Sequence, residues 1–307
     1  MVVKILGSAA GGGFPQWNCA CSNCARLRED RFQGEARSQA QLAWSDGAGG
    51  WTLLNASPDL RQQIESTPEL WPRNGRKSPI RDVILTGAEV DQALGLLLLR
   101  EFHSFRVHAT PAVRAVLTED NSMYRTLARF AGQVCWSDIA SDTPFSAGGA
   151  RIEPLELPGS ALPGFVQPER AAQLKAAESA IGLIMTPEAG SEAGGGAMAF
   201  LPGIGSVSDE LIERLAACNV ILFDGTFWTD EEPKTIPGIT RTARQMGHLP
   251  ISGPGGSLDR LSSLSQTRRI FIHINNTNPI LDEAGNAFRT IRDCGWELAR
   301  DGMEILL

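Results

Sequence analysis

The chain has 307 residues, of which 42% are hydrophobic and 21% charged, and this composition excludes a chain that is disordered over most of its length. Lysine and arginine number 28 against 35 aspartates and glutamates, so the net charge is −7, and without a long basic run we expect no nucleic acid partner. The longest apolar run, residues 93–99, is far shorter than the roughly 20 residues of a membrane helix. We therefore expect a cytoplasmic protein with no membrane span, forming one domain over residues 1–307.

The predicted elements alternate between strands and helices, which is typical of an α/β fold. Apolar and β-branched runs predict strands at residues 2–6, 51–54, 81–85, 107–110, 152–155, 181–185, 220–223, 269–274 and 305–307. Helical spacing of apolar residues predicts helices at 60–64, 93–100, 111–117, 208–217 and 258–264. The 32 glycines and 18 prolines favour many short strands over a helical bundle.

Three of the six cysteines, Cys19, Cys21 and Cys24, lie close together after a glycine-rich segment. A CxCxxC cluster places three thiolates on one short loop, and tetrahedral zinc needs one more ligand. The alternative is a group of reduced thiols without metal, which is less favoured because clustered exposed thiols oxidise readily. The fourth ligand is expected far along the chain, which offers four histidines: His103, His108, His248 and His273. The first two flank one predicted strand and are expected to be structural.

Polar side chains follow several predicted strands at the point where each strand ends. Glu89 and Asp91 come after the strand at 81–85, Asp224 ends the strand at 220–223, and His273 lies at the end of another. Loops from such strands converge at one edge of a sheet, so this pattern indicates a metal site. The alternative for Glu89 and Asp91 is a solvated loop in which Asp91 caps the helix that follows.

His248 lies in the constrained segment MGHLPISGPGGS, which favours a ligand or acid–base role over a hydrogen-bonded structural histidine. Asp224 ends an apolar strand, and a buried carboxylate needs a metal or an arginine partner. Catalytic roles are therefore predicted for His248 and Asp224. Arg241 and Arg244 are placed to bind the carboxylates of a diacid substrate by bidentate hydrogen bonds, with solvated surface positions as the equal alternative.

The segment TGAEVDQALGL, which begins at Thr86, resembles the THxHxDHxxGL signature of metallo-β-lactamase-fold proteins. The positions of its three usual histidines hold Gly87, Glu89 and Gln92. The segments VILFDGTFW and FIHINNTNP resemble the strands that carry the bridging aspartate and the last histidine of that fold. Together with LGSAAGGGFPQWNCACSNC, LTGAEVDQALGLLLLRE and MGHLPISGPGGSL, they resemble the pyrroloquinoline quinone (PQQ) biosynthesis protein B family over essentially the whole chain.

This resemblance implies a metallo-β-lactamase αββα sandwich of mixed sheets with helices outside. It implies a structural zinc on the three clustered cysteines and His273, although the place of His273 in the last histidine strand also allows an active-site role. Two activities are described for the family: iron- and oxygen-dependent hydroxylation of the tyrosine in a glutamate–tyrosine crosslinked precursor, and transport of PQQ or a precursor to the periplasm. We favour the enzyme, with the carrier as the alternative and a metallohydrolase as the least favoured class.

The ligand types support this preference. Carboxylates with imidazole and open positions are typical of iron(II) oxygenases, whereas a di-zinc hydrolase centre is rich in histidine. The candidate iron ligands are Glu89, Asp91, Gln92, His248 and Asp224. Gln92 replaces a histidine that is usual in the family, and its neutral amide predicts weaker iron binding or a substitute ligand. The expected cofactors are thus Zn²⁺ and Fe²⁺, and the expected partners are a small-molecule or crosslinked diamino-acid substrate, other PQQ pathway proteins and, as a candidate, a second copy of the chain.

Overall fold

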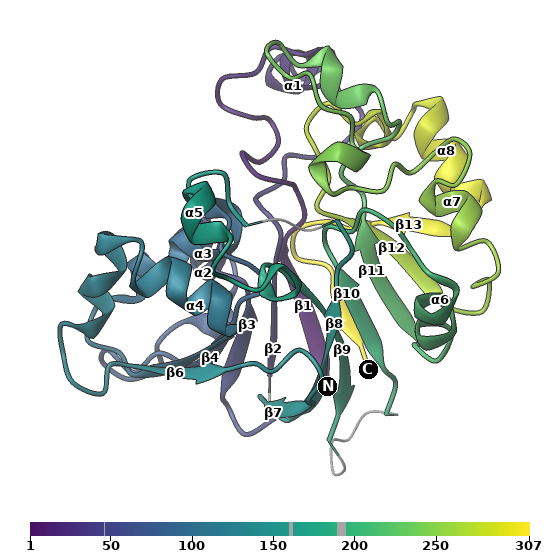
Figure 1. Ribbon diagram of the computed structural model, residues 1–307. Coiled ribbons are helices and arrows are strands. Elements are labelled where there is room, and N and C mark those ends of the chain that lie inside the picture. Colours follow the sequence, from purple (N-terminus) through teal and green to yellow (C-terminus); the bar gives the residue numbers. More distant parts are fainter. Residues whose placement is uncertain (46, 160–161, 189–194) are drawn as a thin grey trace.

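Two seven-stranded sheets lie face to face, with helices on their outer sides (Figure 1). The structure is a computed structural model that describes residues 1–45, 47–159, 162–188 and 195–307. The first sheet has the order β14-β1-β2-β3-β4-β5-β6. Its strands are β14 (Glu304–Leu306), β1 (Val2–Gly7), β2 (Gln41–Ser45), β3 (Trp51–Leu54), β4 (Ile80–Ile84), β5 (Phe105–Ala109) and β6 (Val134–Asp138).

The second sheet has the order β13-β12-β11-β10-β9-β8-β7. Its strands are β13 (Trp296–Leu298), β12 (Arg268–Ile272), β11 (Val220–Asp224), β10 (Met198–Leu201), β9 (Ile181–Pro187), β8 (Ala150–Glu156) and β7 (Phe145–Ala147). Each sheet is mixed: β3 to β6 and β10 to β13 run parallel within their sheets, and the other neighbours pair antiparallel. The parallel strands β11 and β12 therefore deliver their carboxyl ends to one edge.

Short helices connect the strands. The α-helices are α1 (Ser22–Arg28), α2 (Leu60–Glu65), α3 (Val90–Ala93), α4 (Pro111–Thr118), α5 (Pro168–Ala171), α6 (Asp209–Ala216), α7 (Ser257–Arg260) and α8 (Asn286–Asp293). The 3₁₀ turns are η1 (Pro68–Leu70), η2 (Leu94–Leu99), η3 (Ser122–Ala128), η4 (Ala176–Glu178), η5 (Glu232–Thr235), η6 (Arg244–Met246) and η7 (Pro279–Leu281). No helix in the described parts of the chain is long and apolar enough to cross a membrane.

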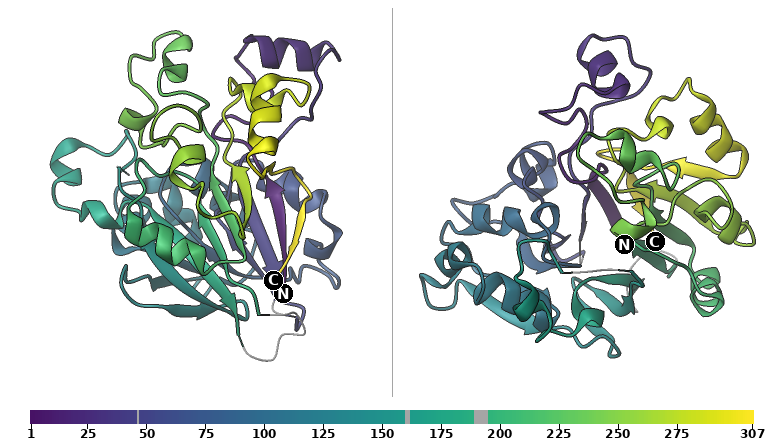
Figure 2. Two further views of the ribbon diagram at one scale, coloured as in Figure 1. Left: turned by 90° about the vertical axis from the view of Figure 1, so that its right-hand side faces the viewer. Right: turned by 45° about the horizontal axis from the view of Figure 1, so that its top comes forward.

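The core lies between the sheets and beneath the helices on both sides. Strands of both sheets contribute to one cluster of buried side chains, which includes Trp44 on β2 and Phe200 on β10. Separate clusters lie under α2 and α4 and under α6 and α8. The two chain termini lie side by side (Figure 2) because β1 pairs with β14. This packing is the αββα arrangement expected from the sequence.

Each strand predicted from the sequence is present within a few residues, and the helices at 60–64, 111–117 and 208–217 are present as α2, α4 and α6. The helix predicted at 93–100 is instead the 3₁₀ turn η2, and the helix at 258–264 ends early as α7. Gly95 explains the first difference. Its amide donates to the carbonyl of Ala56 at 2.7 Å, and a Cβ at this position would lie 2.3 Å from the oxygen of Ser57. The segment is thus drawn against the loop after β3.

Candidate metal centres

A pocket of about 430 Å³ opens where β4, β11 and β12 end. Six of the residues singled out in the sequence line it: Glu89, Asp91, Gln92, Arg241, His248 and His273. They come from three separate stretches of the chain, as expected for loops that converge at one sheet edge.

Asp224, His248 and His273 form the centre of this site. Their ligand atoms lie within 4.8 Å of one another, and the two imidazole rings stack with centroids 5.6 Å apart. Asp224 Oδ2 lies 2.9 Å from His248 Nδ1. Asp91 adjoins the cluster, because its Oδ2 lies 3.1 Å from His273 Nε2. Two imidazoles and two carboxylates are thus brought together.

Local backbone structure explains these positions. Asp224 is the last residue of β11 and is fully buried, and the backbone amides of Ile204 and Thr226 donate to its two carboxylate oxygens. His273 directly follows β12 and has a φ of 59°. This left-handed conformation is uncommon for a residue with a side chain, and such strain is characteristic of functional sites. The chain therefore turns sharply where the imidazole enters the pocket.

Thr226 is a member of the site that the sequence did not reveal. Its Oγ1 lies 2.6 Å from Asp224 Oδ1 and 2.8 Å from His273 Nδ1. A side chain that contacts both ligand-bearing residues fixes their orientation, as groups around metal ligands commonly do. The available signal was its place two residues after the aspartate in the segment LFDGTFW.

Asp91 and His273 favour each other's charged forms. Burial opposes ionisation of Asp91, but the hydrogen bond and charge of His273 outweigh it and lower the pKa of Asp91 below its ordinary value. Burial likewise opposes protonation of His273, but the hydrogen bond and charge of Asp91 raise the pKa of His273. At the pocket rim, desolvation and then the charge of Asp91 raise the pKa of Glu89. The ionised carboxylate of Asp91 is thus available to a cation once the imidazole of His273 gives up its proton.

Gln92 lines the pocket close to Gly87. A Cβ on Gly87 would lie 2.2 Å from Gln92 Oε1, so the missing side chain at position 87 makes room for this amide. Gln92 Oε1 is buried and has no hydrogen-bond partner among the described residues. An unpaired buried oxygen costs about 1–3 kcal/mol, and such a cost is commonly offset by a ligand or an ordered water.

The two arginines differ in position. Arg241 lines the pocket, with its Nε donating to the carbonyl of Gln245 at 3.1 Å. Arg244 instead donates from Nη2 to the carbonyl of Gly255 at 2.9 Å and does not appear among the described lining residues. Of the two arginines, Arg241 therefore lies in the pocket and Arg244 outside its described lining.

The three clustered cysteines form a second centre. The sulfurs of Cys19, Cys21 and Cys24 lie within 4.8 Å of one another, and none is in a disulfide. The expectation that His273 supplies their fourth ligand needs correction, because its ring lies with Asp224 and His248 in the other centre. The side chain that faces the sulfurs is Asn276.

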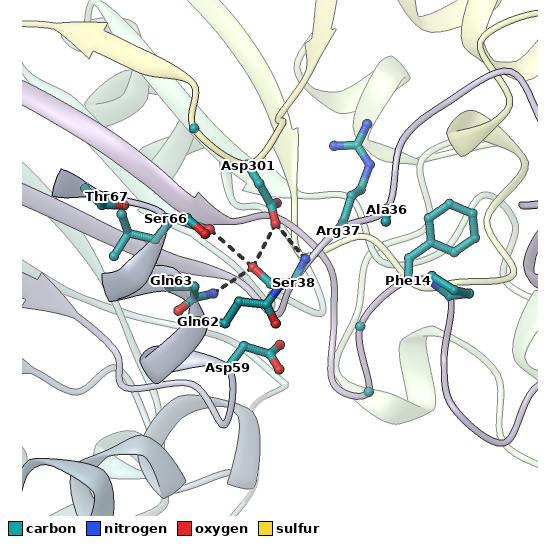
Figure 3. Close-up of a pocket in the computed structure, with 15 residues that line it drawn as sticks. Phe14, Ala36, Arg37, Ser38, Asp59, Gln62, Gln63, Ser66, Thr67 and Asp301 are labelled. Carbon is teal, nitrogen blue, oxygen red and sulfur yellow. Dashed lines mark hydrogen bonds between the residues drawn. The ribbon is translucent and has the colours of Figure 1, made fainter. Parts of the chain in front are cut away.

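A further cavity of about 480 Å³ lies between the glycine-rich loop and α2 (Figure 3). Its polar groups already bond to one another: Asp301 accepts from the amide and hydroxyl of Ser38 at 2.7 and 2.8 Å, and Gln63 Nε2 donates to the same hydroxyl at 2.8 Å. This network ties Ser38 to Asp301 and to α2, and none of the candidate residues from the sequence lines the cavity.

The donor set of the first centre fits a transition metal ion. Mononuclear iron(II) sites typically have imidazole nitrogens and carboxylate oxygens on one side of the metal and open positions on the other. The three sulfurs fit a structural zinc instead, because thiolates prefer softer ions and leave no open position once a fourth ligand binds.

The two sheets and the acidic, histidine-bearing edge define a metallo-β-lactamase-fold protein, and residues 50–274 match the family model of the β-lactamase superfamily domain. The chain is 38% identical over 309 residues to coenzyme PQQ synthesis protein B of Xanthomonas euvesicatoria pv. vesicatoria (strain 85-10), and 41% identical over 319 residues to that of Pseudomonas protegens, with 100% of each chain covered. The protein belongs to the coenzyme PQQ synthesis protein B family, which confirms the resemblance found in the sequence.

Solved structures agree with this assignment. The crystal structure of Zn²⁺-bound PqqB from Methylobacterium extorquens superposes with a TM-score of 0.89, at 38% identity over 100% of both chains. A diphosphatase of the PhnP family has a TM-score of 0.65 at 17% identity, covering 99% of this chain and 96% of the other. At 17% identity, the similarity to the diphosphatase shows the fold alone. The expected αββα fold is thereby confirmed.

Proposed function

We propose that this protein acts in PQQ biosynthesis as an iron- and oxygen-dependent hydroxylase of the tyrosine ring in the glutamate–tyrosine crosslinked precursor. Membership of the coenzyme PQQ synthesis protein B family supports the pathway. The observation that carries the enzyme class is the convergence of two aspartates and two histidines on one pocket. Iron(II) held by Asp91, Asp224, His248 and His273 would supply the binding and activation of O₂ beside the substrate.

The protein's own residues would position the substrate and move its proton. Arg241 uses Nε and Nη2 on the carbonyl of Gln245, which leaves further N–H donors of its five for a substrate carboxylate. Asp224 accepts a hydrogen bond from His248 Nδ1, and this contact fixes the tautomer in which Nε2 carries no proton. Nε2 of His248 is then available to bind metal or to take the phenolic proton of the tyrosine.

We further propose that zinc on Cys19, Cys21 and Cys24 is structural. The PqqB structure from Methylobacterium extorquens binds Zn²⁺, and the three sulfurs of this chain have the ligand type and spacing that zinc requires. Replacing Cys21 by Ser should lower zinc content and melting temperature together. One tightly bound zinc with unchanged stability in that variant would contradict the assignment.

The test of the enzyme is a single-turnover reaction. The protein is loaded anaerobically with iron(II), mixed with the crosslinked precursor and a chemical reductant, and then exposed to O₂. Each hydroxylation puts one oxygen atom of O₂ into the ring, while the other leaves as water with two electrons from the reductant. We expect the mass of the precursor to rise by whole oxygen atoms, and an Asp224→Asn variant to lose this product. A His103→Ala variant should retain it, because the only described polar partner of His103 Nε2 is the carbonyl of Ile80.

The carrier is the second candidate, because Gln92 stands where the family usually has a histidine and therefore weakens the ligand set. In the same experiment a carrier would bind the precursor tightly and return it with its mass unchanged. A metallohydrolase would return cleaved product without any need for O₂.

A further inference from the structure

The amide of Asn276 faces all three sulfurs of the cysteine cluster. Its Nδ2 lies 3.1 Å from Cys19 Sγ, 3.6 Å from Cys21 Sγ and 3.4 Å from Cys24 Sγ. The side chain is almost fully buried, with 4% of the residue exposed. One polar group thus lies above the face of the triangle that the three sulfurs form.

These distances match a tetrahedral zinc site. With zinc–sulfur bonds of about 2.3 Å and a zinc–oxygen bond of about 2.1 Å, an oxygen and a sulfur in the same tetrahedron lie about 3.6 Å apart. The three separations, 3.1, 3.4 and 3.6 Å, equal this value or fall short of it by no more than about 0.5 Å. The end of the Asn276 side chain therefore occupies the fourth corner of the tetrahedron.

Hydrogen bonding alone accounts for the arrangement less well. An amide NH₂ has two hydrogens, whereas three sulfurs lie around it. Rotation of the amide by 180° exchanges its nitrogen and oxygen, and this choice of orientation follows from the surroundings. No hydrogen bond to Asn276 Oδ1 is found in the described parts of the chain, so the rotation gives up only the three contacts of Nδ2 with the sulfurs and presents an oxygen lone pair to the centre of the site.

The backbone beside Asn276 is held in place independently of the amide. Asn23 on α1 donates from Nδ2 to the carbonyls of Asn276 and Asn278, at 3.1 and 3.0 Å. The fourth corner is thus preorganised by contacts between the α1 region and the segment after β12.

We propose that Oδ1 of Asn276 is the fourth ligand of the zinc ion held by Cys19, Cys21 and Cys24. This inference rests on the structural zinc proposed above and is independent of the iron chemistry. The ion then joins the N-terminal loop to the segment after β12 in which Asn276 lies.

The direct test is X-ray absorption at the zinc edge of protein purified without iron. We expect three sulfur ligands near 2.3 Å and one oxygen or nitrogen ligand near 2.1 Å. Three variants then assign the light ligand: Asn276→Ala, Asn276→Asp and, as a matched control, the neighbouring Asn275→Ala, whose Nδ2 donates to Thr277 Oγ1. Zinc affinity is measured by competition with a chelator, and coordination by the visible spectrum after cobalt(II) substitution.

Asn276→Ala should lower zinc affinity by about tenfold or more, and Asn275→Ala should leave it unchanged. Asn276→Asp separates ligation from hydrogen bonding, because a carboxylate supplies oxygen but no N–H donor. Retained or tighter zinc with a tetrahedral cobalt spectrum in Asn276→Asp supports ligation. Zinc loss in Asn276→Asp as severe as in Asn276→Ala overturns it, as does an absorption spectrum without a light ligand. If the alanine variant fails to fold, the wild-type absorption spectrum and the aspartate variant still decide. All readouts are taken without iron, O₂ or precursor, so failure of the hydroxylase proposal would leave them unchanged.

Discussion

Glu232 should give this protein a measurable dependence of stability on pH. The residue is 8% exposed, and its carboxylate accepts from the amide of Trp228 at 2.5 Å and from the hydroxyl of Thr277 at 2.6 Å. Burial raises its pKa from 4.5 to about 7, although these hydrogen bonds oppose the rise. Glu232 therefore binds its proton more tightly in the folded chain than in the unfolded one.

The sign and size of the effect follow from this difference. Between pH 4.5 and about 7 the folded state binds more protons, so the free energy of unfolding falls as pH rises through this window and is level above it. At about 1.4 kcal/mol per pKa unit, the full loss is on the order of 3 kcal/mol. In Glu232→Gln this contribution to the pH dependence disappears, because an amide does not titrate.

Urea denaturation of the wild type, Glu232→Gln and the exposed neighbour Glu231→Gln, over a pH series from 5 to 8, measures this contribution. From pH 5 to pH 8 the wild type should lose on the order of 3 kcal/mol of unfolding free energy relative to Glu232→Gln. Glu231→Gln should follow the wild type. Parallel curves for all three proteins would refute a raised pKa at Glu232.

Three further predictions concern the pocket and its support. Gln92→His should tighten iron(II) binding by about tenfold or more, as measured by anaerobic titration, and equal affinities would place position 92 outside the ligand set. Arg241→Ala should raise KM for the diacid precursor by about tenfold or more, whereas Arg244→Ala should change it little; equal effects would remove the distinction between them. Gly95→Ala should lower the free energy of unfolding by about 1–3 kcal/mol, because the added Cβ would meet backbone atoms of Ala56 at 2.8 Å. An unchanged urea midpoint in this variant would contradict that contact.

Much of the fold was predictable because the strands are coded by local apolar runs. The fully buried strand β11 reads as a continuous run of apolar residues that ends at Asp224. The β2 strand was missed, although Trp44 is fully buried in it, because its five residues carry no clear alternation of apolar and polar side chains. The 3₁₀ turn η2 was also unpredictable, since Gly95 is held by the backbone of Ala56, which is distant in sequence.

The sequence likewise predicted some of the residues in the candidate sites and missed others. Asp91, His248 and Asp224 were found because each stands in a local motif, and the structure brings all three to one pocket or its wall. His273 was assigned to zinc, but the left-handed turn after β12 directs its ring into that pocket. Asn276 was not predicted as a zinc ligand because zinc in proteins is usually bound by cysteine, histidine or carboxylate side chains, although Asn276 lies just after His273 in the polar run INNTN.

The origin of the oxygen in the product distinguishes a hydroxylase from a hydrolase and from a carrier. The iron(II)-loaded protein is given the crosslinked precursor and reductant under ¹⁸O₂ in ordinary water, and the reaction is repeated under ordinary O₂ in H₂¹⁸O. We expect ¹⁸O to enter the precursor ring from O₂ in the first reaction and not from water in the second. We expect Asp224→Asn to form no labelled product. Unchanged precursor in both reactions, or label that enters only from water, would contradict a hydroxylase built on Asp91, Asp224, His248 and His273.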